Sequence, residues 1–253
     1  MISLIMCSRD DARFAGASAT YAKALAGTDH EVIRIPDARS MSEGYNRALL
    51  QAKGDPILLS HDDIELLSPD TFASRLLGHM EHFDVLGVAG TTRLMGPAWF
   101  NGGPPHLYGQ LVHPHPDAGH YRVSLFGAPA RSMGHMQAVD GVLMSVRRAV
   151  FERIRFDERY SGFHLYDVDF SFTAHLAGYR VGCAFDLDLY HHSAGAFRDP
   201  EWEKAAWAFM AKYEKQLAAP EFPVKWQGSV AKVNSLAEAR RRLHPDHWDL
   251  LSQ

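Results

Sequence analysis

Short apolar runs alternate with longer stretches of mixed polarity along residues 1–90. Four runs have the length and apolar character of buried strands: Ile2–Cys7, Glu31–Ile35, Pro56–Ser60 and Val85–Gly90. The stretches between them predict helices over Phe14–Ala26, from Ser40 to Ala52, and after Ser68-Pro69-Asp70. Strands that alternate with helices in this way predict an α/β fold, with a mainly parallel sheet and helices on both of its faces.

Local signals mark the ends of these helices. Ser40 and Glu43 have the spacing of a capping box, in which both side chains bond backbone N–H groups of the first turn. Gly54 is the expected C′ residue of that helix, because glycine readily takes the left-handed conformation found there. Ser68 is the expected N-cap of the third helix, with Pro69 at its first position.

The alternation breaks between Thr91 and Val139, where glycine, proline, histidine and aromatic residues are frequent. A stretch of this length predicts a functional loop or an insertion with short strands. Regular structure then returns, with strands over Asp140–Val146 and Tyr179–Phe185 and helices over Arg147–Ile154, Asp167–Ala177 (closed by Gly178) and Asp199–Leu217. The tail from Ser229 to Gln253 is predicted to be helical and basic around Arg240–Arg242.

The predicted helix Asp199–Leu217 has an apolar and aromatic side, which predicts packing against the core rather than a binding surface. Its members are Trp202, Ala206, Phe209, Met210, Tyr213 and Leu217.

Composition limits the classes of function. A formal net charge of −4 and a pI near 6.4 argue against a nucleic-acid binder, which would present a basic surface. Cys7 and Cys183 lie in separate apolar runs, so we expect reduced, buried thiols and no zinc motif. A strand directly after Met1 leaves no room for a signal peptide, and no apolar run reaches the length of a membrane span. We therefore expect a cytoplasmic protein, with peripheral contact at the inner face of a membrane left open.

Two carboxylates and an imidazole, His61-Asp62-Asp63, follow the buried strand Pro56–Ser60. Charges at the end of a buried strand are costly unless they meet a cation or a partner. In open α/β sheets, ligands bind at the carboxyl ends of the strands. The cluster therefore suggests a divalent metal that holds a phosphorylated ligand. The alternative is a pair of helix-capping aspartates on a surface loop.

A second acidic pair, Asp167 and Asp169, opens a predicted helix about a hundred residues later. Helix capping accounts for such a pair, because the macrodipole favours negative charge there. If the pair lies at the same sheet edge as the first cluster, one carboxylate is placed to deprotonate an acceptor hydroxyl. Capping, or the positioning of a neighbour, is the role expected of Asp169.

Six short motifs follow one another along the chain: Asn46-Arg47 with Lys53-Gly54-Asp55, His61-Asp62-Asp63, Asp140-Gly141 through Arg147-Arg148, Phe156-Asp157-Glu158, Tyr166-Asp167-Val168-Asp169 with Gly178-Tyr179-Arg180-Val181, and His191-His192-Ser193-Ala194-Gly195. Their order and spacing, over roughly Ile2 to Phe197, resemble the family 2 glycosyltransferases of the GT-A fold, in a bacterial glycosyltransferase-like branch. Two residues depart from the family pattern. His61 stands at the first Asp of the metal motif, and Tyr166 stands where a Glu precedes the base.

The resemblance implies that a sugar moves from a nucleoside diphosphate sugar to a hydroxyl acceptor, with inversion at the anomeric carbon. Asp63 would bind Mn²⁺ or Mg²⁺, and His61 would be a further ligand or contact a phosphate. His191, or failing it His192, would reach the metal or the diphosphate from an opposite loop. Asp167 would act as the general base.

The resemblance also implies where the donor lies. Its nucleoside, diphosphate and sugar would contact Ser8, Arg9, Asp37, Asn46, Asp62 and Asp140. The alternative for Asp37 is an ordinary turn residue after Pro36. The stretch Trp99–Gly103 would form part of the acceptor site, because aromatic faces stack on sugars and glycines let a loop move.

Residues 1–198 would form the GT-A domain, with a nucleotide-binding half (1–90) and an acceptor half (91–198), and residues 199–253 a helical extension. The donor base (UDP, GDP or dTDP) is left open. So is the acceptor, which could be a glycan, lipid-linked, protein or small-molecule acceptor in bacterial polysaccharide or glycoconjugate synthesis. Two other classes stay under consideration. One is a nucleotidyltransferase, although no glycine-rich loop follows the first strand; the other is a catalytically inactive sugar- or nucleotide-binding module or complex subunit.

Overall fold

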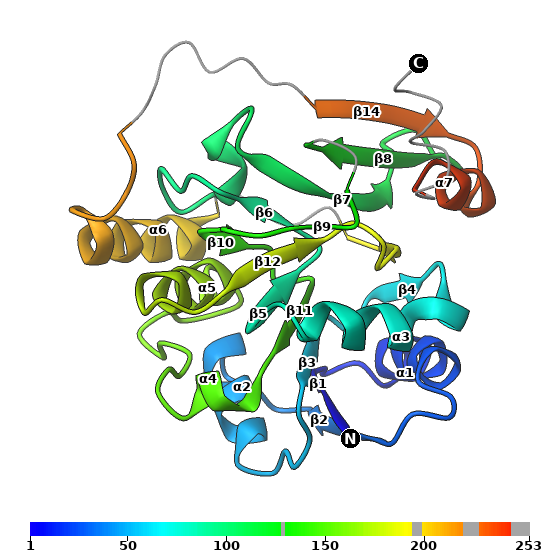
Figure 1. Ribbon diagram of the computed structural model, residues 1–253, viewed down its shortest axis with the longest axis horizontal. Helices are drawn as coiled ribbons and strands as arrows, with labels where there is room; N and C mark the ends of the chain where they lie inside the picture. The colour runs from blue at the N-terminus through cyan, green and yellow to red at the C-terminus, as the bar shows by residue number, and fades with distance from the viewer. Residues whose placement is uncertain (128–129, 194–198, 220–227, 244–253) are drawn as a thin grey trace.

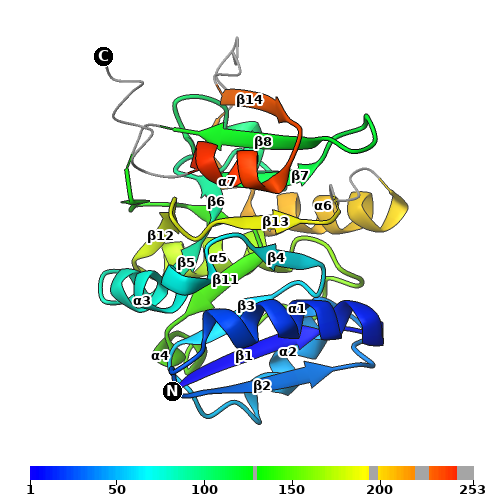
Figure 2. The ribbon, with the colours of Figure 1, turned by 90° about the vertical axis from the view of Figure 1, so that its right-hand side faces the viewer.

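The computed structural model describes residues 1–127, 130–193, 199–219 and 228–243. Two sheets form the framework of these residues, and helices cover the first sheet on both faces (Figure 1). Turning the molecule shows the second sheet above the first, with β8 and β14 at the end farthest from the N-terminus (Figure 2).

The first sheet has seven strands in the order β2-β1-β3-β11-β5-β12-β9. Their bounds are β1 Ile2–Cys7, β2 His30–Ile35, β3 Ile57–Ser60, β5 Val85–Gly87, β9 Ser132–Met133, β11 Leu143–Val146 and β12 Val181–Ala184. Strands β1, β2 and β3 pair in parallel, as do β5 and β12, whereas β11 runs antiparallel between β3 and β5. The predicted mainly parallel sheet is confirmed, with β11 and the short β9 as its antiparallel members.

Helices pack on both faces of this sheet, as the alternation predicts. Helices α1 (Asp11–Ala24) and α3 (Pro69–Met80) share a hydrophobic cluster with Leu4 and Met6 of β1. Helices α2 (Met41–Leu49), α4 (Arg148–Phe151) and α5 (Tyr166–Leu176) share another with Ile5. Successive residues of β1 therefore point to opposite faces, and both faces are buried.

The second sheet is built largely from the stretch between Thr91 and Val139. It contains β10 (Ala138–Val139), β6 (Ala89–Thr91), β7 (Leu107–Pro114), β13 (Leu189–His191) and β4 (Ile64–Leu66), in that order. Strand β8 (Tyr121–Phe126) pairs with β7, and β14 (Gly228–Val233) pairs with β8. The expected insertion with short strands is confirmed, together with the 3₁₀ turn η1 (Trp99–Gly102).

Several sequence predictions about this region are wrong. The run predicted as one strand to Gly90 is two, β5 and β6, which enter different sheets. The tail predicted as helical from Ser229 starts with strand β14 and becomes helical only in α7 (Leu236–Leu243). Its residues 244–253 lie outside the described residues, as does the predicted domain boundary at residue 198, which stays a prediction.

The helix-end signals were only partly right. The Ser40 hydroxyl accepts from Glu43 N (3.1 Å), and Gly178 has the positive φ of 85° expected after α5. Helix α2 ends at Leu49, so Gly54 is not its C′ residue. Ser68 does not cap α3 with its side chain, because its hydroxyl donates to the buried Asp188 instead (2.8 Å).

Helix α6 (Pro200–Tyr213) is held against α5 by a buried charge. Lys212 Nζ lies 2.6 Å from the carboxylate of Asp169, whose side chain is 2 % exposed. The hydroxyls of Tyr160 and Tyr213 donate to the same carboxylate. Asp169 therefore positions a neighbouring helix, one of the two roles expected for it. Phe209 is buried as predicted, but Met210, on the same predicted apolar side, is 38 % exposed.

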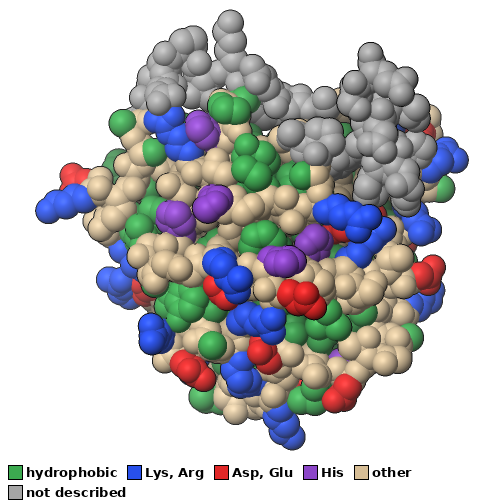
Figure 3. Space-filling model, viewed as in Figure 1, with side chains coloured by type: hydrophobic (Ala, Val, Ile, Leu, Met, Phe, Trp, Pro, Cys, Tyr) green, Lys and Arg blue, Asp and Glu red, His purple; other side chains and the backbone are tan. Residues whose placement is uncertain are grey.

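Charge is mixed on the face drawn in Figure 3, where Lys and Arg side chains are interspersed with Asp and Glu. None of the helices in the described part of the chain combines the length and the apolarity needed to cross a membrane.

We predict that Lys212→Met lowers the free energy of unfolding by about 3 kcal/mol, because the Asp169 carboxylate would remain buried without its cation. Urea unfolding followed by circular dichroism measures the change. Lys204→Met is the matched control, since it removes the same charge from an exposed position of α6 and should change stability by less than about 0.5 kcal/mol. Equal losses in the two variants would show that the ion pair does not stabilise the fold.

Candidate active site

The candidate site lies where strands of both sheets end. Strand β1 ends at Cys7, so Ser8 and Arg9 follow it, and β3 ends at Ser60, so His61 follows it. Asp63 directly precedes β4. Parallel strands end at a common edge, and this brings segments from distant parts of the chain together there.

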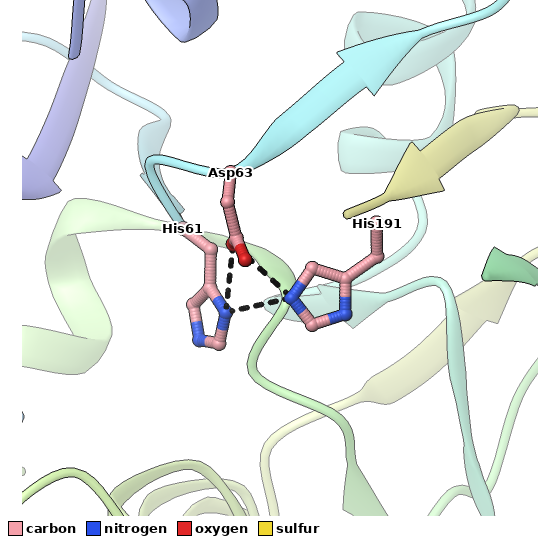
Figure 4. Close-up of side chains that lie close together, drawn as sticks. All are labelled: His61, Asp63 and His191. Carbon is pink, nitrogen blue, oxygen red and sulfur yellow. Dashed lines mark hydrogen bonds and ion pairs between the residues drawn. The ribbon is translucent and has the colours of Figure 1, made fainter. Parts of the chain in front are cut away.

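Three side chains point toward one another at this edge: His61 and Asp63 from the connection between β3 and β4, and His191 from the end of β13 (Figure 4). His191 Nε2 lies 3.2 Å from the Asp63 carboxylate and 3.3 Å from His61 Nδ1. All three potential ligand atoms lie within 4.8 Å of one another. Two imidazole nitrogens and a carboxylate oxygen at these separations suit one divalent ion, and imidazole favours Mn²⁺ over Mg²⁺.

The backbone fixes this arrangement. Strands β4 and β13 pair antiparallel, with His191 opposite Ile64. Beyond that pair, His192 N donates to Asp63 O (2.9 Å), so the chain of His191 runs alongside Asp63. The sequence predicted a loop at His191, but it is the last residue of β13, and this register rather than loop conformation places its side chain.

Electrostatics favour the metal-binding forms of these groups. Burial lowers the pKa of His61, and the neighbouring His191 lowers it further, so the ring is neutral at pH 7. Burial opposes ionisation of Asp63, but its interactions with His191, His61 and Ser193 outweigh the effect of burial and hold the pKa of Asp63 below its usual value. A neutral imidazole and an ionised carboxylate are the forms that coordinate a cation.

A cavity of about 310 Å³ opens on one side of the three residues. Ser8, Arg9 and Asp62 line it, as the resemblance implies for the donor. The Arg9 guanidinium also donates to Ala38 O and lies 5.5 Å from the ring of Phe163, which lines the cavity too. Sequence reasoning missed Phe163, because one aromatic residue in a loop carries no recognisable signal.

A second cavity of about 290 Å³ is also lined by His61, His191 and Phe163. Its wall includes Asp140, predicted to contact the donor sugar or the acceptor, and Asp167, predicted to be the base. The aromatic residues Trp99, Phe100 and Trp202 complete it. Trp99 belongs to the stretch predicted to contact the acceptor, and Trp202 comes from α6, whose aromatic side was assigned to the core.

Asp167 lines this second cavity and has a raised pKa. Burial, and after it the negative charge of Asp140, raises the pKa of Asp167 to about 7. Gly141 N donates to its carboxylate (2.7 Å), which fixes the side chain. Asp140 accepts from Trp99 Nε1 (2.9 Å) and from Val142 N (2.9 Å). Asp140 is therefore held in an acidic pair, although it precedes β11 instead of opening it as predicted.

Three predicted site residues have other partners. The Asn46 amide bonds the backbone of Phe156 in both directions (2.9 and 3.1 Å) and ties α2 to that loop. Asp37 pairs with Arg47 at 2.7 Å. His192 is exposed and its ring packs on Tyr190 (4.5 Å), so it does not join the metal-ligating group of His61, Asp63 and His191. Ala194 and Gly195 of the last motif lie outside the described residues.

The chain matches a known protein family and is similar to a curated protein. The model of the glycosyltransferase-like family matches residues 3–221. Streptomycin biosynthesis protein StrF from Streptomyces griseus is 26% identical over 169 residues, which are 65% of this chain and 57% of StrF. This chain thus spans a little over half the length of that curated relative.

Among solved structures, S. aureus TarS residues 1–349 match with a TM-score of 0.50 at 14% identity, covering 87% of this chain and 66% of that one. The complex of the same TarS fragment with UDP matches equally well, with 67% of its chain covered. At this identity the likeness shows the fold alone, and it confirms the GT-A fold that the six motifs imply.

We predict that Mn²⁺ raises the melting temperature of the protein and that His191→Ala abolishes this shift, because the variant removes one of three converging ligands. Differential scanning fluorimetry with and without EDTA measures it. His192→Ala is the matched control, since it deletes the adjacent, exposed ring and should keep the shift. The opposite pattern in the two variants would assign the ligand to His192.

Proposed function

The chain belongs to the glycosyltransferase-like family, and from this premise we propose that it transfers a sugar from a nucleoside diphosphate sugar to a hydroxyl acceptor, with inversion and with the help of a divalent metal. One observation carries the proposal: His61 lines two cavities, of which the first is also lined by Asp63 and the second by His191 and by the carboxylate of Asp167. An inverting transfer needs this order, because the acceptor must approach from the side opposite the departing diphosphate.

We assign the nucleoside to the first cavity. Its walls are mainly apolar near Ile35 and Ala38, with Ser8, Arg9 and Arg13 supplying donors. A base fits between apolar walls, and guanidinium groups match phosphate oxygens. A divalent cation held by the three ligands would offset the negative charge that develops on the leaving diphosphate. The donor set of two imidazoles and one carboxylate supports Mn²⁺ over Mg²⁺.

We assign the donor sugar and the acceptor to the second cavity. The indole of Trp99, fixed by its bond to Asp140, lines this cavity together with Phe100 and Trp202, and aromatic side chains commonly stack on sugar rings. Asp167 would accept the proton of the acceptor hydroxyl as that oxygen attacks the anomeric carbon. A base with a pKa near 7 suits this task at neutral pH, because about half of it is ionised there and the ionised form is still basic.

The direct test measures release of free nucleoside diphosphate from a panel of UDP-, GDP- and dTDP-sugars. We expect slow release from one donor without acceptor, dependent on Mn²⁺ and abolished by EDTA. Glycan, lipid-linked and protein acceptors should be added in turn, together with small molecules, since the relative StrF is assigned to streptomycin biosynthesis. Donor-induced thermal stabilisation without turnover under every condition would favour a catalytically inactive sugar-binding module.

We predict that Asp167→Asn lowers the rate of transfer by about 10²–10⁴-fold while donor binding is kept, because the amide fills the same space but cannot accept a proton. Since the pKa of this carboxyl is raised, its basic form is present above about pH 7 and is lost below it. The rate of the unaltered protein should therefore rise with pH, be half-maximal near pH 7, and level off about one pH unit higher.

Asp70→Asn serves as the control, because it makes the same chemical change at an exposed residue of α3. Its rate and pH profile should match those of the unaltered protein. Near-normal transfer by Asp167→Asn, or an unchanged ascending limb in its pH profile, would assign the base elsewhere.

A further inference from the structure

The hydroxyl of Tyr166 lies between two groups of the candidate site. It donates to Gly141 O (3.1 Å) and lies 2.8 Å from His61 Nε2. The side chain is buried, and its ring packs against Tyr45 with ring centres 5.6 Å apart. Its hydroxyl is therefore held in one place beside the imidazole.

The direction in which the Tyr166 hydroxyl donates its one proton decides which ring nitrogen of His61 is protonated. A phenol carries one proton, and a backbone carbonyl such as Gly141 O can only accept. If the Tyr166 proton goes to Gly141 O, the oxygen can only accept from His61, so the imidazole proton must sit on Nε2. The lone pair of His61 is then on Nδ1, the atom that faces His191 Nε2 (3.3 Å) and the Asp63 carboxylate (3.8 Å).

We propose that Tyr166 is a positioning residue, which fixes His61 in the Nε2-protonated tautomer and so presents Nδ1 as a metal ligand. The inference rests on the metal site of the proposed function and adds the group that orients it. A metal-ligating histidine commonly donates its other ring N–H to an oxygen that sets its tautomer and orientation.

This proposal explains why the chain departs from the family motif at two positions. His61 and Tyr166 are separated by about a hundred residues, but their side chains touch. The second nitrogen of an imidazole ligand carries an N–H that needs an acceptor, whereas a carboxylate ligand has no such N–H. A carboxylate at position 166 could accept from His61 but could not also donate to Gly141 O, whereas the phenol does both. The two departures thus form one coupled feature.

Gly141 leaves room for this arrangement. A Cβ atom there would collide with the Tyr166 hydroxyl and lie 2.6 Å from Asp167 Cβ. The carbonyl that takes the tyrosine proton can approach closely because the residue is glycine.

The first test uses the protein without metal or donor. Nitrogen NMR of labelled histidine should show Nε2 of His61 protonated and Nδ1 unprotonated. The His61 signals are assigned by their loss in His61→Gln. Tyr166→Phe should give a mixture of tautomers or reverse the preference. Nδ1 protonated in the unaltered protein would overturn the proposal. This result does not depend on turnover, so it stands apart from success or failure of the proposed transferase activity.

The second test measures Mn²⁺ affinity by titration calorimetry. Tyr166→Phe should weaken binding about 10–100-fold, the usual effect of losing such an outer partner. Tyr21→Phe is the matched control, because it also removes a buried hydroxyl beside β3, one that donates to Ser60 Oγ (2.9 Å) and does not bond His61. Its affinity should stay within about threefold. Unchanged affinity in Tyr166→Phe, or equal losses in both variants, would show that the tyrosine does not orient the ligand.

Discussion

The antiparallel pairing of β4 with β13 is the interaction on which the candidate site depends. It joins β4, which follows β3 in the chain, to β13, which comes much later in the chain, after β12. The pairing places His191 beside Asp63, and a slip of one residue would turn His191 away and bring His192 in. Ser68 and Gln110 secure the register from outside by donating to the buried carboxylate of Asp188, one residue before β13.

The sequence predicted those parts of the fold that depend on nearby residues. Apolar runs bounded by turns located the parallel strands, and Ser40 and Gly178 marked helix ends correctly. Predictions failed where a distant partner decides the outcome. Ser68 has every local property of an N-cap, but its hydroxyl donates a hydrogen bond to Asp188 instead of capping the helix. The strand β14 carries no local signal that distinguishes it from a helix, because only pairing with β8 makes it a strand.

The same limit applies to the site. Acidic residues after buried strands, and the order of the motifs, were enough to single out Asp63, His61 and Asp167. The sequence ranked His191 ahead of His192 but kept both as candidates, because adjacent residues face opposite ways and only the register of β13 decides between them. Nor could it show that the departures at His61 and Tyr166 belong together, although both were visible as departures. Their contact exists only after α5 packs beside the end of β3.

One residue, Gly141, connects the two parts of the candidate site. Gly141 N donates to the carboxylate of Asp167, and Gly141 O accepts from Tyr166, which in turn contacts His61. The proposed base and a proposed metal ligand are therefore oriented by opposite ends of the same residue. A displacement of this residue would disturb both at once, which gives a physical reason for a glycine that allows close approach of α5. The spacing between the proposed base and the proposed metal site thus depends on the backbone of one residue rather than on two independent side chains, as the proposed displacement reaction requires.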